Sequence, residues 1–481
     1  MLTTILIFLP IVAALALWIS PWQTVRAAGG FALLVALAEL FLWVVALLNL
    51  DFAAGGLQHS TEVVWFADLD VAYKVGLYDF SLWLVGLTTL VGVAATAYGF
   101  WAGRARPRAY FGLLLFLTGA TIGVFAAQDL LLFYVFFEAM LIPLYVLIGA
   151  WGGIGRIGAT IKLIIYTLAG SLLMLVAIIA LGLANGTFDM TELGRQDDVW
   201  IFLGFVVAFA VKAPVWPFHG WLPDAYREAP AEVSALLSGV VSKTAAYGLL
   251  RIVLPSFPDP VADWRVPVLV LASIGLVYGS LLAFRAPDVR GVIAYSSLAQ
   301  MCLIVIGIFA LNDSGLNGAL LQMVNHGLIS AALFLLAGGI ERRAATGRLE
   351  LLGGMARGRP ALATMLITVG VIALAVPFST AFAAEFLILN GIFEHGWGWA
   401  VVGAVAIVLA AMYMLRLISA VLHEDVGTSV HEEALDLRPA EVGMVGALVA
   451  ALLVLSFWPA GITDRVFGGE PAASVARQFE E

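Results

Sequence analysis

Ionisable side chains stand inside several long apolar stretches of this sequence, where a charge at the centre of a membrane helix costs at least ~2.5 to 3.5 kcal/mol. Each such residue therefore needs a partner or a function. Carboxylate, ammonium and imidazole groups exchange protons, so a set of them sealed from water can bind a proton and pass it on. The residues in question are Glu39, Glu138, Lys212, Lys243, His326, Glu385 and Arg416.

Glu138 follows an aromatic run and has no opposite charge within a helical turn. It is either a structural carboxylate paired permanently with a lysine, or a carboxylate whose proton affinity changes when its partner moves. Only four of the 24 basic residues are lysines, and two of them, Lys212 and Lys243, fall in apolar runs. A lysine can load and release a proton as its surroundings change, whereas an arginine stays charged.

His326 lies among polar neighbours in the middle of another apolar run. It is either a hydrogen-bonded core residue or a relay group that titrates near neutral pH. Glu385 follows a Pro-containing interruption by eight residues and corresponds in the second half of the chain to Lys212 in the first. Glu39 has no partner that the sequence identifies, and Arg416 lies near a helix end, where we expect it to anchor the helix.

The composition restricts the class of protein that can contain these residues. Of the 481 residues, 62% are hydrophobic and 12% are charged, against roughly 25% charged in an average soluble domain. The single cysteine, Cys302, excludes a disulfide scaffold and any cysteine-ligated zinc or iron-sulfur centre within this chain. A net charge of −9 without a long basic run argues against nucleic acid as a partner.

Apolar runs predict an all-α polytopic membrane protein, because a segment of this length satisfies its backbone in lipid only as a helix. We predict about fourteen transmembrane helices and read the first as a retained span rather than a signal peptide. The predicted helices cover residues 2–20, 29–50, 77–101, 108–126, 129–150, 158–184, 199–218, 232–254, 266–285, 290–310, 317–340, 361–393, 398–421 and 440–460.

The basic residues predict the orientation of the chain. Loops after the odd-numbered helices carry fifteen Lys and Arg residues, whereas the opposite side, with both termini, carries six. By the positive-inside rule the first set faces the cytoplasm, so both termini lie outside.

Two blocks of five helices, the fourth to eighth and the ninth to thirteenth, predict an inverted repeat because each contains an odd number of crossings. Prolines interrupt the fourth helix of each block, the seventh and twelfth helices overall, in residues 212–217 and 376–380. Proline breaks the helical hydrogen-bond ladder, and broken helices at matching positions indicate a transport site. The expected organisation is residues 1–107 for helices one to three, 108–254 and 266–421 for the two repeats, and 422–481 for the last helix and a C-terminal tail.

A G-x-G-x-x-G pattern spans Gly153 to Gly158. Such a pattern binds dinucleotides only after a strand in a βαβ unit. Here it joins two predicted membrane helices, so we expect no nucleotide site.

Four segments of the sequence resemble a known family. They are the run Lys212-Ala-Pro-Val-Trp-Pro-Phe-His219-Gly-Trp221-Leu-Pro223-Asp224, the later Ser242-Lys243-Thr-Ala-Ala-Tyr-Gly, and the segments around Glu138 and Tyr295. These segments are similar to those of the antiporter-like subunits of respiratory complex I and the related Mrp-type cation/proton antiporters. The likeness covers the third to fourteenth helices. Within the family, this sequence is most similar to the subunit M (mitochondrial chain 4) type, because it has glutamate in the broken twelfth helix. The intervals of 31 residues from Lys212 to Lys243 and of 142 from Lys243 to Glu385 are also similar to those of that type.

The resemblance implies a proton-translocating subunit of NADH-quinone oxidoreductase with no redox centre of its own. It implies a Glu138–Lys212 ion pair, a central Lys243, a relay through His326 and Glu385 as the terminal group. FMN, iron-sulfur clusters and quinone are expected on partner subunits, which include other antiporter-like subunits and the peripheral redox arm. The expected location is a bacterial-type inner (plasma) membrane.

The sequence departs from the family pattern at three places. Gln300 stands where this type of subunit often has histidine, so we expect a water chain to bridge that point. Asp288-Val-Arg290-Gly291 replaces a more basic run, and residues 228–239 are more similar to Mrp-type and hydrogenase-associated relatives. A Na+/H+ antiporter or hydrogenase-associated subunit is therefore an alternative, and a purely structural membrane anchor is a third, although an anchor has no use for buried charges.

Overall fold

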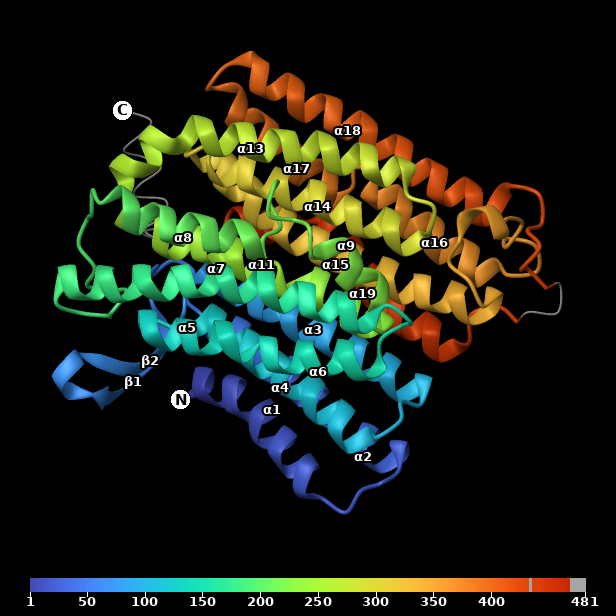
Figure 1. Cartoon of the computed structure of the whole chain (residues 1–481), viewed down its shortest axis with the longest axis horizontal. Helices are drawn as coiled ribbons and strands as arrows, with labels where there is room; N and C mark the ends of the chain where they lie inside the picture. Colours follow the sequence, from blue (N-terminus) through green and yellow to red (C-terminus); the bar gives the residue numbers. More distant parts are fainter. Residues whose placement is uncertain (432–434, 468–481) are drawn as a thin grey trace.

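The structure is a computed structural model that describes residues 1–431 and 435–467 of the chain. Almost all of its elements are helices, and most run in roughly the same direction across the molecule (Figure 1). The predicted C-terminal tail, with Arg477 in it, extends beyond the described residues.

The elements of the N-terminal part are α1 (Leu2–Ile19), α2 (Val25–Asn49), β1 (Gln58–Phe66), η1 (Ala67–Leu69), β2 (Val71–Leu77), α3 (Asp79–Ala102), α4 (Pro107–Ala126), α5 (Leu130–Ala139), α6 (Leu141–Trp151) and α7 (Arg156–Asn185). The middle part contains α8 (Val199–Lys212), α9 (Leu222–Glu228), α10 (Ala231–Leu236), η2 (Leu237–Val241), α11 (Lys243–Gly248), η3 (Leu249–Val253), α12 (Leu254–Ser256), α13 (Pro258–Arg285) and α14 (Val289–Ile308). The remaining elements are α15 (Asp313–Ala344), η4 (Leu349–Leu351), α16 (Pro360–Ala373), α17 (Thr380–Phe393), α18 (Trp397–Ile418), η5 (Ser419–His423), α19 (Pro439–Phe457) and α20 (Ala460–Thr463).

Twelve helices of the described part are long and apolar enough to cross a membrane. The predicted runs 199–218 and 361–393 are not among them, because helical structure is interrupted in each. A further difference concerns α13, which begins at Pro258 rather than near residue 266. Prolines are tolerated in the first turn of a helix, where their missing N–H has no intrahelical partner to lose.

Both predicted breaks are present. Helix α8 ends at Lys212, and regular helix resumes at Leu222. Helix α16 ends at Ala373, and α17 begins at Thr380 after Ser379, whose side chain accepts a hydrogen bond from the amide of Phe382. Prolines in each gap remove a backbone donor, which explains why the helices stop there.

The helical run from Ala231 to Ser256 is continuous but irregular. Two π-helical turns, η2 and η3, flank α11, which starts at Lys243. The most apolar 18 residues of this run and of α15 are all buried among other helices, whereas α1 and α2 lie at the edge of the bundle (Figure 1). The most sheltered helices are therefore those that contain Lys243 and His326.

A β-hairpin, formed by β1 and β2, projects from one end of the bundle (Figure 1). The all-α prediction is wrong for this segment, which we expected to be a loop between two helices. The hairpin is held by neighbouring loops, because the amide of Gln128 donates to the carbonyl of Lys74 at 2.9 Å and Lys74 forms an ion pair with Asp189. These contacts attach the hairpin to residues that lie more than fifty positions away in the sequence.

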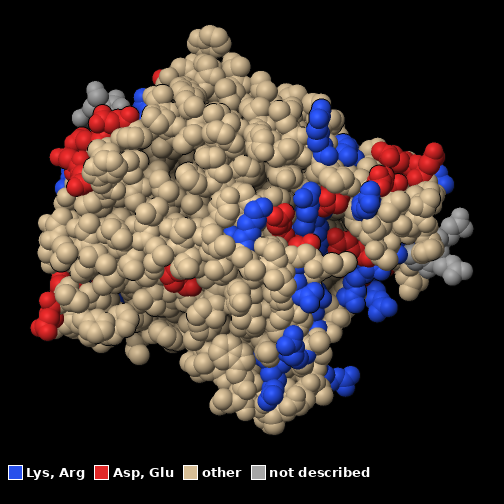
Figure 2. Space-filling model, viewed as in Figure 1, with Lys and Arg blue, Asp and Glu red and all other residues tan. Residues whose placement is uncertain are grey.

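The loops gather at two opposite ends of the bundle, as the predicted alternation of crossings requires. At one end the loops near residues 20, 105, 153, 228, 288, 347 and 425 contact one another. At the other, which we call the hairpin end, loops near residues 59, 74, 128, 190 and 256 meet. Figure 2 shows most Lys and Arg side chains of the visible face toward the first end, which we call the arginine-rich end.

Candidate functional site

Lys243 is fully buried at the start of α11, directly after the π-helical turn η2. The amide of Ser242 bonds to the carbonyl of Leu237, five residues back, so the carbonyl of Ser238 lacks its usual backbone partner. Lys243 Nζ donates to this carbonyl at 2.6 Å and contacts Ser242 Oγ at 3.3 Å. The irregular turn thus supplies acceptors for an ammonium group that forms no ion pair with a carboxylate in the described part of the chain.

A row of buried serines lies between Lys243 and His326. The hydroxyl of Ser238 hydrogen-bonds to that of Ser297 on α14, at 2.9 Å, and to that of Ser330 on α15. Ser297 Oγ lies 3.0 Å from His326 Nε2. Hydroxyl groups both donate and accept, so this row can pass a proton to the imidazole, whereas the lysine bonds to the carbonyl of Ser238 and not to its hydroxyl.

A second hydrogen-bonded row ends at Glu385. Gln322 Nε2 donates to Gln300 Oε1 at 2.6 Å, and Gln300 Nε2 donates to Glu385 Oε1 at 3.2 Å. All three side chains are buried. The amide of Gln300 thus joins α15 to the carboxylate on α17, and the water chain expected past this residue stays a prediction.

The two rows meet on α15. Gln322 and His326 are four residues apart and therefore lie on the same face of this helix, about 5 to 6 Å apart at Cβ. Beside them, Asn325 Nδ2 donates to the carbonyl of Thr380 at 2.9 Å and its oxygen accepts from the Thr380 hydroxyl at 2.7 Å. This pair fixes the N-terminus of α17, and with it the position of Glu385.

Lys212 is the last residue of α8 and is buried. The negative end of a helix dipole favours a cation at this position. Its Nζ lies 4.7 Å from the ring centroid of Phe137 and has no hydrogen-bond partner among the described residues. The indole of Trp221 donates to the carbonyl of Val211 at 2.9 Å, which fastens the segment after the break onto the end of α8.

The ion pair that the resemblance implied between Glu138 and Lys212 is not a direct contact in the structure. No ion pair joins them among the described residues, although each lies in the electrostatic surroundings of the other. Glu138 is only half-buried and neighbours Ser171 on α7, while the Lys212 ammonium lies over the ring of Phe137. The structure therefore places Lys243, His326 and Glu385 along two buried rows that approach each other on α15, and leaves Glu138 and Lys212 beside them.

Glu39 on α2 is buried away from these rows, and neither carboxylate oxygen hydrogen-bonds to a described residue. The structure identifies no partner for it.

The G-x-G-x-x-G segment has a structural explanation. The amide of Gly153 donates to the carbonyl of Glu228 at 2.8 Å, and the amide of Gly155 donates to its carboxylate at 2.9 Å. A Cβ at Gly153 would lie 2.6 Å from the Glu228 carboxylate. Glycine is required there because another loop approaches the backbone closely.

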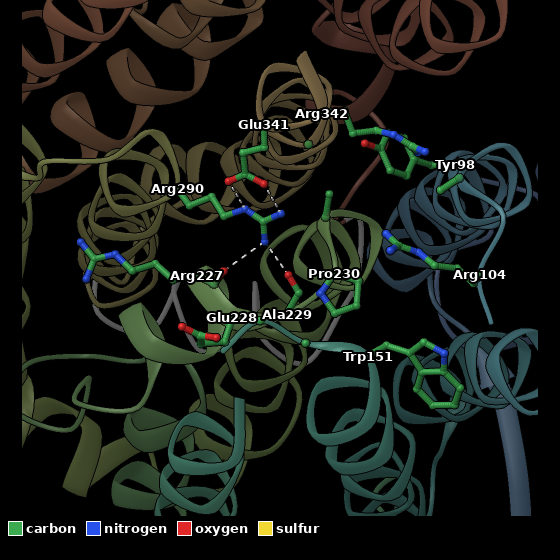
Figure 3. Close-up of a pocket in the computed structure, with 15 residues that line it drawn as sticks. Tyr98, Arg104, Trp151, Arg227, Glu228, Ala229, Pro230, Arg290, Glu341 and Arg342 are labelled. Carbon is green, nitrogen blue, oxygen red and sulfur yellow. Dashed lines mark hydrogen bonds and ion pairs between the residues drawn. The ribbon is translucent and has the colours of Figure 1, made fainter. Parts of the chain in front are cut away.

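A cavity of about 460 Å³ opens at the arginine-rich end, beside the N-terminus of α10 (Figure 3). On its wall Arg290 donates to both oxygens of Glu341 at 2.7 Å, and Arg104 donates to both oxygens of the buried Glu232 at 2.6 and 2.7 Å. Four arginines line the cavity against two carboxylates, Glu228 and Glu341, so its lining is polar and carries more positive than negative side chains.

Sequence reasoning missed Ser238, Ser297 and Ser330, because serine is common in membrane helices and carries no distinctive spacing. Three polar residues on α15 at Gln322, Asn325 and His326 were the available signal.

Among the described residues, no group of three or more His, Cys, Asp or Glu side chains could hold a metal ion.

Comparisons with known proteins agree with this geometry. Residues 127–410 match the family described as NADH:quinone oxidoreductase/Mrp antiporter, TM. The NADH-quinone oxidoreductase subunit M of Rhodobacter capsulatus is 37% identical over 97% of this chain and 94% of its own length. The NAD(P)H-quinone oxidoreductase chain 4 1 of Synechococcus elongatus is 34% identical over 98% of this chain and 91% of its own length.

Among solved structures, a chain of respiratory complex I from Thermus thermophilus with bound NADH superimposes with a TM-score of 0.90 at 28% identity, covering 99% of both chains. A chain of the Mrp complex from a Dietzia species has a TM-score of 0.88 at 22% identity, covering 99% of this chain and 97% of its own, which shows a shared fold. The family match spans more than half of the chain and the curated relatives cover nearly all of it. The resemblance seen in the sequence is thus confirmed, and the chain belongs to the family of antiporter-like membrane subunits of NADH:quinone oxidoreductases and Mrp antiporters.

Proposed function

We propose that this chain is a proton-translocating membrane-arm subunit of NADH-quinone oxidoreductase. The observation that carries the proposal is a pair of buried hydrogen-bonded rows: one runs from Ser238, whose carbonyl holds Lys243, through Ser297 to His326, and the other from Gln322 through Gln300 to Glu385. A chain of protonatable and hydroxyl groups across the middle of a helical bundle has the chemistry of a proton path.

In the proposed cycle, a change in the separation of Glu138 and Lys212 alters the proton affinity of the lysine. The proton then moves to Lys243, through the serines to His326, and on to Glu385. Because an amide does not titrate, Gln300 orients the carboxylate and water carries the proton past it. Re-approach of Glu138 reloads Lys212.

The free energy for this cycle comes from quinone reduction elsewhere in the complex. FMN, iron-sulfur clusters and quinone are proposed to reside on the partner subunits, which are the peripheral redox arm and further antiporter-like membrane subunits. The family relatives named above are subunits of such an oxidoreductase.

The proposal includes the finer architecture expected from the sequence. The chain would cross the membrane fourteen times, with the paired helices α8/α9 and α16/α17 acting as broken spans, and both termini would lie outside. Residues 108–254 and 266–421 would form the inverted repeats, flanked by 1–107 and 422–481.

Lys243→Arg in the assembled complex tests the function directly. Arginine keeps the charge and can donate to the carbonyl of Ser238, but it cannot release a proton. We expect NADH-driven proton pumping to fall at least tenfold in membrane vesicles, with quinone reduction depressed because the two are coupled. Lys162→Arg is the matched control, since Lys162 is exposed and pairs with Asp224.

Normal pumping by a well-assembled Lys243→Arg complex would exclude the proposed path. A sodium-dependent pH gradient in membranes that oxidise no NADH would instead assign the chain to the antiporter class of the family.

A further inference from the structure

Arg251 is a buried cation that the proposed path does not use. It lies in η3, eight residues after Lys243 in the same helical run, and its side chain is 3% exposed. Its neighbours, Tyr78, Gln128 and Met190, all belong to segments at the hairpin end. The guanidinium therefore stands between the central lysine and that end of the molecule.

Every hydrogen bond that the structure gives this guanidinium goes to a neutral group. Nη2 and Nε donate to Gln128 Oε1 at 2.8 and 3.2 Å, Nη1 donates to the carbonyl of Met190 at 3.4 Å, and Nη2 also contacts Tyr78 Oη at 3.4 Å. The ring of Tyr78 lies beneath the charge at 4.9 Å. Among the described residues no carboxylate forms an ion pair with Arg251.

Several partly buried arginines are paired with carboxylates, as Arg343 is with Glu441 and Arg104 with Glu232. Of the carboxylates at the hairpin end, Asp189 pairs with Lys74, Asp129 accepts amides of β2 and α5, and Asp79 accepts the amide of Phe80. A buried unpaired charge is costly, so its retention calls for a function.

Gln128 holds the arginine in place and is itself fully buried. Its Nε2 donates to the carbonyl of Ala126 at 3.3 Å, which turns its oxygen toward the guanidinium. Its backbone amide bonds to the carbonyl of Lys74, and its carbonyl accepts from the amide of Met190. The hairpin and two neighbouring loops thus cover Arg251 from the hairpin end.

A fixed positive charge opposes the approach of a proton. Eight residues of helix place the two Cα atoms about 12 Å apart along the axis, and a guanidinium neither accepts nor releases a proton at physiological pH. Positively charged side chains exclude protons from membrane pores by the same effect.

We propose that Arg251 is an electrostatic barrier that prevents the proton on Lys243 from leaving toward the hairpin end, so that the serines and His326 are its only exit. The inference rests on the proposed proton-translocating function. It gives the path a direction, which a row of hydrogen bonds alone does not have.

Three variants of the whole complex in proteoliposomes test the barrier. Arg251→Gln removes the charge, Gln128→Glu neutralises it by placing a carboxylate against the guanidinium at unchanged side-chain size, and Arg251→Lys replaces the permanent charge by an ammonium group that can lose its proton. Two quantities are measured: protons pumped per electron during NADH oxidation, and the decay rate of an imposed pH gradient without turnover. Native gels establish assembly.

For Arg251→Gln and Gln128→Glu we expect quinone reduction to continue, the proton-to-electron ratio to fall at least twofold, and the passive gradient to decay several times faster. Arg251→Lys should give values between those of the wild type and Arg251→Gln, because a buried lysine opposes a proton only while it is itself protonated, which a merely structural role would not predict. If Arg251→Gln fails to assemble, Gln128→Glu decides. Assembled variants with the original ratio and a tight membrane would overturn the barrier.

Lys243→Arg, measured in parallel, separates the two proposals. If it abolishes pumping while the neutralised variants stay tight, only the barrier is wrong. If it pumps normally, the proposed function fails and the barrier fails with it.

Discussion

Lys212 and Lys243 are both buried, but their surroundings differ at the scale of single atoms. Lys243 donates to the carbonyl that a π-helical turn leaves free, whereas Lys212 lies over an aromatic ring without a hydrogen-bond partner among the described residues. An ammonium group without a fixed partner responds strongly when a carboxylate approaches or leaves. Lys212 therefore suits the loading step and Lys243 the central step of the proposed path.

Replacement of Lys212 by alanine should abolish proton pumping and depress quinone reduction severalfold, because the loading group is lost while α8 keeps its geometry. Both rates are measured in membrane vesicles containing the assembled complex. Lys162→Ala, at an exposed position on α7, is the control and should pump normally. An assembled Lys212→Ala complex with wild-type pumping would contradict the role of this residue.

At the scale of elements, a residue distant in the sequence caps α16, the first helix of the second broken span. Asp436 accepts hydrogen bonds from the amides of Ala361 and Leu362, at 2.8 and 3.0 Å, in the first turn of α16. Burial alone would raise the pKa of Asp436, but these two amides, the amide of Leu437 and the nearby Arg343 together more than offset that effect, and its pKa lies below the usual value. The carboxylate thus stabilises α16 in its charged form.

Asp436→Ala should destabilise the start of α16 by roughly 0.5 to 2 kcal/mol, the usual cost of losing such a cap. Hydrogen exchange of the amides near residue 361 measures the effect. In the wild type the stabilisation is present above the unfolded pKa of about 3.9 and is lost as the pH falls through the lower folded value. Equal protection in the two proteins at neutral pH would show that the cap contributes nothing.

At the scale of the whole molecule, the separation of loops into two ends makes a prediction about orientation. If the arginine-rich end faces the cytoplasm, the hairpin lies outside. Ser60→Cys in the hairpin should react with a membrane-impermeant maleimide in intact cells, and Arg357→Cys only after the membrane is opened. Both positions are exposed, and the native Cys302 is buried and should remain unlabelled. The opposite labelling pattern would reverse the orientation.

Much of the architecture can be predicted from the sequence alone. Lipid forbids unpaired backbone groups, so long apolar runs had to be helices, and prolines in residues 212–217 and 376–380 indicated interruptions in two of them, although Pro10 and Pro267 lie inside continuous helices. The cost of intramembrane charge likewise singles out Lys212, Lys243, His326 and Glu385 by their positions within apolar runs. These features depend on local composition, so they can be predicted without knowledge of the tertiary structure.

Packing between distant segments decided the rest. The hairpin exists because loops near Gln128 and Asp189 bind it, and the π-helical turn that serves Lys243 forms within a run that is buried on all sides by other helices. The serines of the network have no distinctive pattern in the sequence, and only the packing of three helical segments brings their hydroxyls together. The sequence determined which groups can carry a proton, and only the tertiary structure decided which of them touch, because hydrogen-bond distances depend on how separate helices pack.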